Sequence, residues 1–497
     1  MALRARPATL ASTKAPIECK GMAGISRRRF IKAGALALAA APTRAIGGFA
    51  QTADSSRPIV VIGAGMAGLT AARRLKDAGR RVLVLEASDR VGGRVRTVRT
   101  FAEGLHGEAG AARIADSHSF VVRWISDLGL DVAPFGGSGD SVRLVRGQRL
   151  RATDDAALAA AARNLKPDER GLRPGTLLTR YTADAVRDVD VPEPDAATYA
   201  RWRSYDGVTW PQWLKARGAS EDAVALMTLG GDPFAVSALY VLRQIALNGG
   251  APKFFTVRGG MDALPTALAR SLGDTVVTGA AVRRIEPGGA GVTVAYESQG
   301  RTTRVVADRV VVAIPFPALR RVEIAPALSA TTMSAIAELS YYPATRLLVQ
   351  TGRRGWSKAG LSGAARTDFA AEFWDDGAAQ PGPRGLLSGT VGGRMDASLA
   401  AIDASQRERA VRALAIQAFP EIETDIERVV TVRWAGEPWA WGAFAAPRPG
   451  QMTAFLPAIA RPEGRVHFAG EHTSAWMGWI EGAVRSGERA AQEILRQ

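Results

Sequence analysis

The chain has 497 residues, and its composition of 47% hydrophobic and 23% charged residues is typical of a globular protein with a buried core. One half of its formal net charge of +16 arises in residues 1–50, where nine Lys or Arg residues accompany one Glu. The remaining basic excess forms no run of five or more Lys or Arg residues and accompanies no recognition motif, so nucleic acid is excluded as the expected partner.

Residues 1–50 are predicted to be a signal peptide. SRRRFIK, residues 26–32, precedes AGALALAAAP, residues 33–42, which is too short to span a bilayer. This order resembles a twin-arginine export signal, and it implies that the twin-arginine machinery exports the folded protein to the periplasm or out of the cell. A basic linker before a short helix is the alternative. The only cysteine, Cys19, lies in this segment, so the exported chain would have no disulfide, and no later apolar run is long enough to predict stable membrane insertion.

Residues 58–86 predict a strand, a glycine-rich turn, a helix and a second parallel strand. Gly63, Gly65 and Gly68 form a G-x-G-x-x-G motif in which glycine permits the tight turn, the approach of a pyrophosphate and a close contact between helix and strand. Glu86 follows Gly63 by 23 residues, at the end of the second strand, where a carboxylate accepts hydrogen bonds from a ribose. The alternative is a tight turn with a surface glutamate, but both features together favour a dinucleotide site.

Farther along the chain, a mixed helical stretch is predicted from about residue 117 to residue 247. Short β-like runs follow between residues 275 and 314, and strand-like and helical runs alternate from about 342 to 441. The C-terminal segment predicts a strand, a loop and a long helix.

Two further motifs identify the dinucleotide as a flavin. RVGGRVRT, residues 90–97, and HFAGEHT with GWIEGAVRSGERAA, between residues 467 and 491, resemble the flavin-containing amine oxidase family, and the resemblance extends over about residues 57–494. It implies FAD as the cofactor. It also implies that Gly93 and Arg94 meet the pyrophosphate, Val282 the adenine, Glu471 the ribityl chain, and the Trp479–Ile480 backbone the flavin ring.

The resemblance implies an α/β fold. Its Rossmann-like FAD-binding domain would be assembled from residues 55–118, 248–320 and 456–497. A helical insertion at residues 119–247 and a mixed α+β substrate domain at residues 321–455 would complete the cleft.

GEAGAARIADSH, residues 107–118, contains an arginine that bears on the substrate class. Burial of a substrate carboxylate demands a paired cation, and Arg113 is able to bind it in a bidentate manner. The segment resembles that of L-amino-acid oxidases, where this arginine binds the substrate carboxylate, whereas simple monoamine oxidases generally lack it. A structural arginine is the alternative. His118 is expected in the substrate pocket, orienting Arg113 or a water, although a structural histidine is equally compatible with the pattern.

Other residues are expected to complete the pocket. In the family, an aromatic residue at the position of Trp479 flanks the substrate, and the carbonyl at Gly478 accepts a hydrogen bond from its amine; simple packing is the alternative for Trp479. The four histidines show no ligand-like spacing, so no metal site is expected. The further aromatic residues expected on the pocket walls are Trp374, Trp441 and Phe444.

Arg346 departs from the family pattern. The family commonly has a lysine near the start of the YYPATRLLVQ strand, beside flavin N5, and Arg346 occupies that position here. A guanidinium keeps the positive charge but is wider and planar, which leaves the oxygen step and the electron acceptor open. An outward-facing strand arginine is the alternative.

These observations predict FAD-dependent oxidation of an L-amino acid by O2 to a 2-oxo acid, ammonia and hydrogen peroxide. A monoamine or alkaloid oxidase or dehydrogenase is the alternative on the same fold, and a flavin-bound protein without catalysis is the alternative of another class. Whether the chain forms a homodimer is left open by the sequence.

Overall fold

The computed structural model describes residues 56–231, 236–249, 252–369 and 371–497, and the predicted export signal at residues 1–50 lies outside them. Within these ranges, no helix has both the length and the apolar character that a membrane crossing requires. Neither the export route nor the compartment is tested by the described residues.

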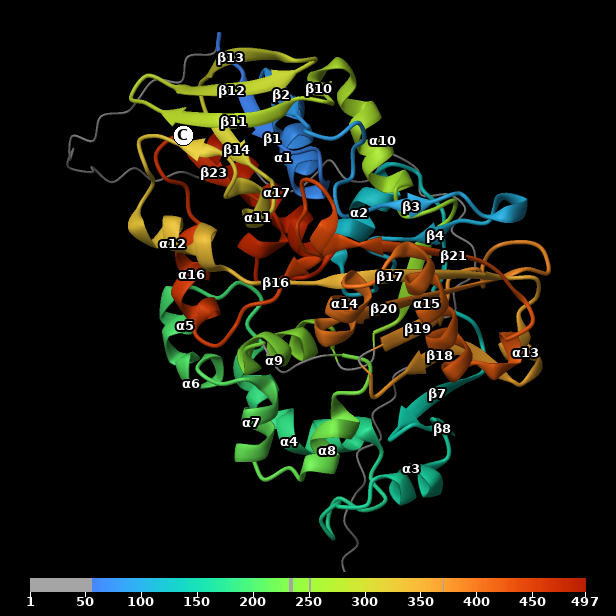
Figure 1. The fold of residues 1–497 in the computed structure, drawn as a ribbon. Helices are drawn as coiled ribbons and strands as arrows, with labels where there is room; N and C mark the ends of the chain where they lie inside the picture. Colours follow the sequence, from blue (N-terminus) through green and yellow to red (C-terminus); the bar gives the residue numbers. More distant parts are fainter. Residues whose placement is uncertain (1–55, 232–235, 250–251, 370) are drawn as a thin grey trace, which may run out of the picture. The chain divides into compact units, whose positions relative to one another are not determined.

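A five-stranded sheet brings together three distant parts of the chain (Figure 1). All of its pairings are parallel, and every residue of Ile59–Ile62 and Val310–Val312 is buried, as expected for a sheet covered on both faces. The predicted α/β fold, with a Rossmann-like sheet built from separated segments, is confirmed, while the domain boundaries given above stay predictions. The strand order is β10 (Val276–Val277), β2 (Val82–Leu85), β1 (Ile59–Ile62), β14 (Val310–Val312) and β23 (Val466–Phe468).

Two helices pack against each other beside this sheet. The first, α1 (Met66–Asp77), begins directly after the glycine-rich turn and ends just before Gly79, whose φ of +76° suits the left-handed position that follows a helix. The last, α17 (Ile480–Leu495), packs closely against α1. Glycine at position 487 permits this approach, because a Cβ there would stand only 2.3 Å from the Ala67 carbonyl oxygen. This close contact fixes the N-terminus of α17 relative to the glycine-rich turn.

A seven-stranded sheet forms the second large layer, and an apolar cluster on one of its faces packs beneath α15 (Ala404–Ala418). The positions that alternate with this cluster point to the opposite face, as the period of two in a strand dictates, where Glu372, Thr390 and Arg346 are polar. Leu348 and Leu386 on the same face belong to a second apolar cluster. The strand order is β21 (Ile426–Arg433), β17 (Ala344–Thr351), β20 (Gly385–Gly392), β19 (Ala371–Asp375), β18 (Leu361–Arg366), β7 (Asp140–Val145) and β8 (Gln148–Arg151).

The β7–β8 hairpin differs from the predicted helical stretch of residues 117–247. Its turn at Arg146 and Gly147 has φ values of +51° and +74°, the conformation that two-residue hairpins favour. β7 then pairs with β18, far along the chain. Local periodicity does not reveal a pairing partner so distant in sequence, which explains why the hairpin was included in the helical stretch.

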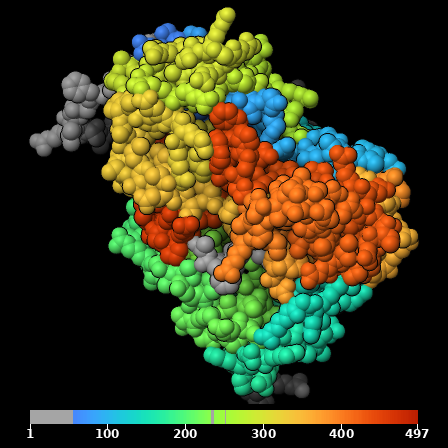
Figure 2. Space-filling view, in the orientation of Figure 1, coloured from blue at the N-terminus to red at the C-terminus, as the bar shows by residue number. Residues whose placement is uncertain are grey.

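The rest of residues 119–247 is mainly helical, as predicted. In the space-filling view of Figure 2, the teal and green surface at the bottom comes mainly from this stretch, and the orange surface on the right comes mainly from the later strands of the seven-stranded sheet and the segments between them. The helices are α2 (Ser119–Asp127), α3 (Asp155–Ala161), α4 (Pro174–Val189), α5 (Ala196–Arg201), α6 (Arg203–Asp206), α7 (Trp210–Ala216), α8 (Glu221–Met227) and α9 (Ala238–Leu247).

Smaller sheets and further helices complete the described part of the chain. A four-stranded sheet consists of β13 (Arg301–Ala307), β12 (Val292–Ser298), β11 (Ala281–Pro287) and β15 (Glu323–Ile324). The others are β5 (Ile114–Ala115) with β9 (Phe254–Val257) and β6 (Val132–Pro134), β3 (Thr97–Val98) with β4 (Gly107–Glu108), and β16 (Tyr341–Tyr342) with β22 (Phe444–Ala445). The remaining helices are α10 (Ala263–Leu272), α11 (Phe316–Leu319), α12 (Ala330–Glu338), α13 (Gly355–Lys358), α14 (Gly393–Ala400) and α16 (Gln451–Ile459).

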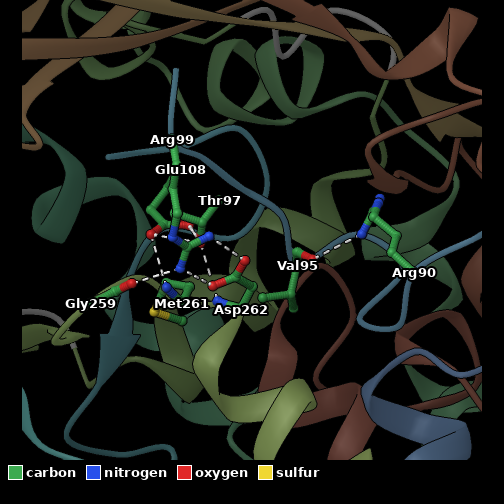
Figure 3. Close-up of polar contacts among 8 residues, drawn as sticks. All are labelled: Arg90, Val95, Thr97, Arg99, Glu108, Gly259, Met261 and Asp262. Atoms are coloured by element: carbon green, nitrogen blue, oxygen red, sulfur yellow. Dashed lines mark hydrogen bonds and ion pairs between the residues drawn. The ribbon is translucent and has the colours of Figure 1, made fainter. Parts of the chain in front are cut away.

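A polar network anchors the β3–β4 pair to the start of α10 (Figure 3). Arg99 donates to both carboxylate oxygens of Asp262 at 2.7 Å, and the buried Glu108 accepts from the Met261 amide at 2.9 Å and from the Thr97 hydroxyl. Burial, assisted by the nearby Asp376 carboxylate, raises the pKa of Glu108 to about 8. The network holds in place the chain that leads from the phosphate turn toward Arg113.

Candidate active site

A single cavity of about 550 Å³ contains both sets of predicted site residues. Residues of the dinucleotide motifs and residues expected around the substrate line the same space, although they are distant in sequence. A cofactor held by the first group would therefore share its cavity with a substrate held by the second. The predicted residues on its wall are Gly63, Gly65, Glu86, Gly93, Arg94, Arg113, Val282, Arg346, Trp374, Phe444, Glu471, Gly478, Trp479 and Ile480.

The glycine-rich turn has the geometry of a phosphate cradle. Gly63 has φ of +101°, and a Cβ at Gly68 would lie only 2.0 Å from the Gly63 carbonyl oxygen, so the turn requires glycine at both positions. A Cβ at Gly65 would meet no protein atom within 4 Å, because this position faces the open cavity. Gly93, with φ of +56°, approaches the Gly65 backbone from the next motif. This space suits a pyrophosphate beside the N-terminus of α1, where the backbone amides favour an anion.

Glu86 is held rigidly at the end of β2. Its carboxylate accepts hydrogen bonds from the Ala64 amide at 2.7 Å and from the amide and hydroxyl of Ser88, both at 2.9 Å. The side chain is buried but lines the cavity, and a carboxylate has further lone pairs for ribose hydroxyls. Val282 on β11 lies on the same cavity wall, as the adenine contact requires.

Arg94 and Glu471 form an ion pair on the cavity wall, with 2.6 Å between Arg94 Nη1 and Glu471 Oε1. Glu471 also accepts from the amides of Gly478 at 2.7 Å and Ala445 at 3.1 Å. Burial is the largest single influence and opposes its ionisation, but the Arg94 guanidinium, His472 and the Gly478 amide together lower the pKa of Glu471. The separate roles predicted for the two residues stay predictions; the structure adds that each orients the other.

The N-terminus of α17 presents Trp479 to the cavity. The Trp479 indole N–H donates to the side-chain oxygen of Gln244 in α9, and the Gln244 amide nitrogen donates to the Met477 carbonyl at 2.8 Å. The Phe254 ring stacks on the indole with 6.2 Å between centroids. Gly478 has φ of +84°, and the Tyr240 hydroxyl would lie only 3.0 Å from a Cβ at this position, so a larger residue would be crowded there.

The prediction that His118 lies in the substrate pocket is wrong. His118 is fully buried behind Trp479, with their ring centroids 4.9 Å apart, and its Nδ1 accepts from the Ala115 amide at 3.3 Å. Burial lowers the pKa of His118 to about 4, so the ring is neutral at pH 7. Its ring supports the indole, because it packs edge-on against both Trp479 and Trp476.

Arg113 reaches the cavity with a partner that was not predicted. Its guanidinium lies beside two aromatic rings that meet edge to face, 5.1 Å from the Phe254 centroid and 5.6 Å from the Phe135 centroid. Its two terminal nitrogens face the two carboxylate oxygens of Glu372 at 3.3 and 3.4 Å. Burial opposes the ionisation of Glu372, but the guanidinium groups of Arg113 and Arg366 outweigh it and lower the pKa to about 2.

Arg346 also faces the cavity, so the alternative of an outward-facing strand arginine is wrong. Its terminal nitrogens donate to the Thr390 hydroxyl and to the Gly110 carbonyl at 2.6 Å, and its guanidinium lies 4.7 Å from the Trp374 ring centroid. Burial lowers the pKa of Arg346 to about 10, which leaves it cationic at neutral pH. Its Nε is buried and has no hydrogen-bond partner in the structure.

Of the predicted aromatic walls, Trp374 and Phe444 line the cavity, but Trp441 does not. The Trp441 ring instead lies under the Arg321 guanidinium at 4.1 Å. Trp439 lines the cavity in its place. Both tryptophans have left-handed backbone, with φ of +67° at Trp439 and +47° at Trp441, so this irregular turn directs their side chains differently from a strand.

Several cavity residues were missed from sequence. Glu372 stands two positions before Trp374, so strand alternation alone would have placed both on the same face. Tyr240 and Gln244 lie four residues apart on α9, on one helical face, but the partner of that face was not recognisable. Phe135 follows a short strand without any chemical motif. In the described part of the chain, no group of three or more His, Cys, Asp or Glu side chains is arranged to hold a metal ion.

Known proteins share both this sequence pattern and this fold. The chain is 31% identical over 460 residues to an L-amino-acid oxidase of Siganus canaliculatus, covering 89% of this chain and 86% of that protein. It is 31% identical to the putative L-amino-acid oxidase YobN of Bacillus subtilis (strain 168), covering 88% and 94% of the two chains.

Solved structures of amine oxidases superpose on most of the chain. Cyclohexylamine oxidase from Brevibacterium oxydans IH-35A gives a TM-score of 0.76 at 29% identity, covering 89% of this chain and all of that one. Putrescine oxidase bound to putrescine gives 0.78 at 25% identity, covering 89% and 99%.

Residues 66–495 match the family described as flavin containing amine oxidoreductase. The cavity fits the cofactor of that family, because the open space at Gly65, the Glu86 carboxylate and the Arg94–Glu471 pair lie along one wall. The chain therefore belongs to the flavin-containing amine oxidoreductases and is an FAD enzyme.

Proposed function

We propose that this enzyme oxidises an L-amino acid with O2 and water to a 2-oxo acid, ammonia and hydrogen peroxide. The observation that carries the proposal is the Arg113 guanidinium, which lines the flavin cavity beside the Phe135 and Phe254 rings. A permanent cation that lines the cavity fits a substrate that carries a carboxylate. The two L-amino-acid oxidases at 31% identity support this class of substrate.

When bound, FAD supplies the acceptor for a hydride from the substrate α-carbon. The residues of the chain position the substrate: Arg113 binds its carboxylate, the Gly478 carbonyl accepts from the amine, and Trp479 restrains the group between them. Trp479 is suited to this role because Gln244, Phe254 and His118 hold its indole on several sides. Water then hydrolyses the released imine to the 2-oxo acid and ammonia.

A second candidate is an amine oxidase whose substrate lacks a carboxylate. Arg113 already faces an internal carboxylate in Glu372, so a neutral amine would leave the guanidinium compensated. The two solved structures described above are amine oxidases.

The test is a peroxide screen of the purified holoenzyme with the twenty L-amino acids, their D-isomers and the corresponding decarboxylated amines. The proposal expects turnover of one or more L-amino acids, with the matching amine at least about tenfold poorer. Faster turnover of the amines would favour the second candidate. Anaerobic mixing, read as loss of flavin colour, tests substrate oxidation independently of the electron acceptor.

We propose further that residues 1–50 export the folded enzyme through the twin-arginine route to the periplasm or beyond the cell. The support is the sequence order of paired arginines, Phe30 and a short apolar run. Replacing Arg27 and Arg28 together by lysine should retain active enzyme in the cytoplasm. Export at an unchanged level would contradict the proposed route.

A further inference from the structure

The seven-stranded sheet presents a row of polar side chains to the flavin cavity. Glu372 on β19 is opposite Thr390 on β20, and Thr390 is opposite Arg346 on β17. The alternate residue Phe373 belongs to the apolar cluster on the other face of the sheet. Strand pairing therefore fixes Glu372 on the cavity wall, beside Arg113.

The contact between Glu372 and Arg113 has the geometry of arginine binding to a substrate carboxylate. The two terminal nitrogens face the two carboxylate oxygens in parallel, at 3.3 and 3.4 Å. These distances exceed the roughly 2.7–2.9 Å of strong charge-assisted hydrogen bonds. The pair is also in contact with the cavity, with side-chain exposures of 28% for Arg113 and 26% for Glu372. Because the contacts are long and the pair is accessible from the cavity, an incoming carboxylate is able to compete with Glu372 for the guanidinium.

Glu372 has a second cation available once it leaves Arg113. Arg366 Nη2 lies 3.7 Å from Glu372 Oε1, and the Arg366 side chain is 54% exposed. Displacement would thus leave Glu372 paired and near solvent, without the large cost of an unpaired buried charge.

We propose that Glu372 is a specificity-determining residue that occupies the Arg113 guanidinium in the free enzyme and must be displaced by the carboxylate of each substrate. This inference rests on the proposed function, in which Arg113 binds that carboxylate. Glu372 raises the KM for amino acids, and it leaves amines, which do not compete for Arg113, unaffected. It also disfavours substrates that bind the guanidinium too weakly to compete.

The test uses holoenzyme and benzoate as a probe, because benzoate carries a carboxylate and no oxidisable amine. Glu372→Gln keeps the shape of the side chain and removes its charge. We expect benzoate, titrated through the change in flavin absorbance, to bind about fivefold more tightly, the factor that corresponds to one accessible ion pair. The KM for the best L-amino acid should fall by a similar factor. Uncharged benzamide should bind equally to the wild type and to Glu372→Gln.

Two controls separate this effect from a general structural change. Glu421→Gln removes the partner of Arg149, whose side-chain exposure of 32% resembles that of Arg113 but whose pair lies outside the cavity, and it should leave benzoate binding unchanged. In an Arg113→Met background, Glu372→Gln should have no further effect on benzoate, because the two changes act on one interaction. Glu372→Asp is a second variant whose shorter side chain should also tighten benzoate binding.

The outcomes distinguish the inference from the proposed function. If Arg113→Met weakens benzoate binding but the Glu372 variants do not tighten it, Glu372 is not a competitor and the inference fails alone. If Arg113→Met leaves benzoate binding unchanged, Arg113 does not bind carboxylates, and the proposed function fails together with the inference.

Discussion

Replacing Arg113 by methionine should separate substrates with a carboxylate from those without one. Methionine keeps an unbranched side chain beside Phe135 and Phe254 but removes the charge. An amino-acid substrate would then have to place its carboxylate in the cavity without a bidentate partner, whereas the decarboxylated amine would lose no contact with Arg113.

The expected loss of activity follows from two ion pairs of Arg113, one with the substrate carboxylate and one with Glu372. Removing one partner of a buried ion pair costs about 3–5 kcal/mol. In the wild type, the substrate must first displace Glu372, a competing pair of about 1 kcal/mol at this exposure. The net loss is therefore about 2–4 kcal/mol, which lowers kcat/KM for the best L-amino acid roughly 30- to 1,000-fold. Arg113→Lys should recover only part of the loss, because an ammonium does not hold both carboxylate oxygens.

The assay compares kcat/KM for the amino acid and its decarboxylated amine in each variant, by peroxide release and by anaerobic flavin reduction. Flavin absorbance per protein verifies that FAD is retained. Arg149→Met is a matched control, since Arg149 is similarly exposed and pairs with Glu421 outside the cavity. Equal losses for amino acid and amine, with FAD retained, would show that Arg113 has a structural role only.

Three further predictions concern the cofactor, the oxygen step and stability. Gly65→Val should yield folded protein without FAD, because the new side chain meets no protein atom but fills the phosphate space; a complete flavin spectrum would contradict this. Arg346→Met should slow flavin reoxidation by O2 more than reduction by substrate in stopped-flow experiments, because a nearby cation stabilises developing superoxide, and equal effects would place its role elsewhere. The pKa of His118 is lowered from 6.5 to about 4 in the folded protein. Between these pH values the histidine binds a proton only in the unfolded chain, so the free energy of unfolding decreases as the pH is lowered. His118→Gln should therefore abolish about 2 kcal/mol of the stability loss between pH 6.5 and 5 in denaturant titrations, and an unchanged loss would refute the assignment.

Local sequence determined the dinucleotide end of the site. The buried β1 strand, the glycines after it and the carboxylate at the end of β2 obey short-range rules, because backbone conformation and strand spacing set their positions. Gly65 opens to the cavity and Glu86 lines it, as the motif predicts. The C-terminal motif likewise predicted that Trp479 would stand at the start of a helix and face the same space.

The sequence was a poorer guide where the direction of a side chain depended on an irregular backbone, or where a strand depended on a partner distant in the chain. Trp441 was predicted on the cavity wall, but left-handed backbone at two nearby tryptophans places Trp439 there. The β7–β8 hairpin was included in a helical stretch because its partner strand, β18, lies about two hundred residues further along the chain.

The substrate end of the site was decided by tertiary structure. Sequence identified Arg113 as a cation near the flavin, but its partner Glu372 is 259 residues away in the chain. Periodicity shows which face of a strand is buried or polar; it does not show which loop will lie opposite that face. The register of β19 against β20 and the path of the chain after β4 bring the two charges together. The folded chain therefore places a competing carboxylate beside Arg113, and this contact bears directly on which substrates the enzyme accepts.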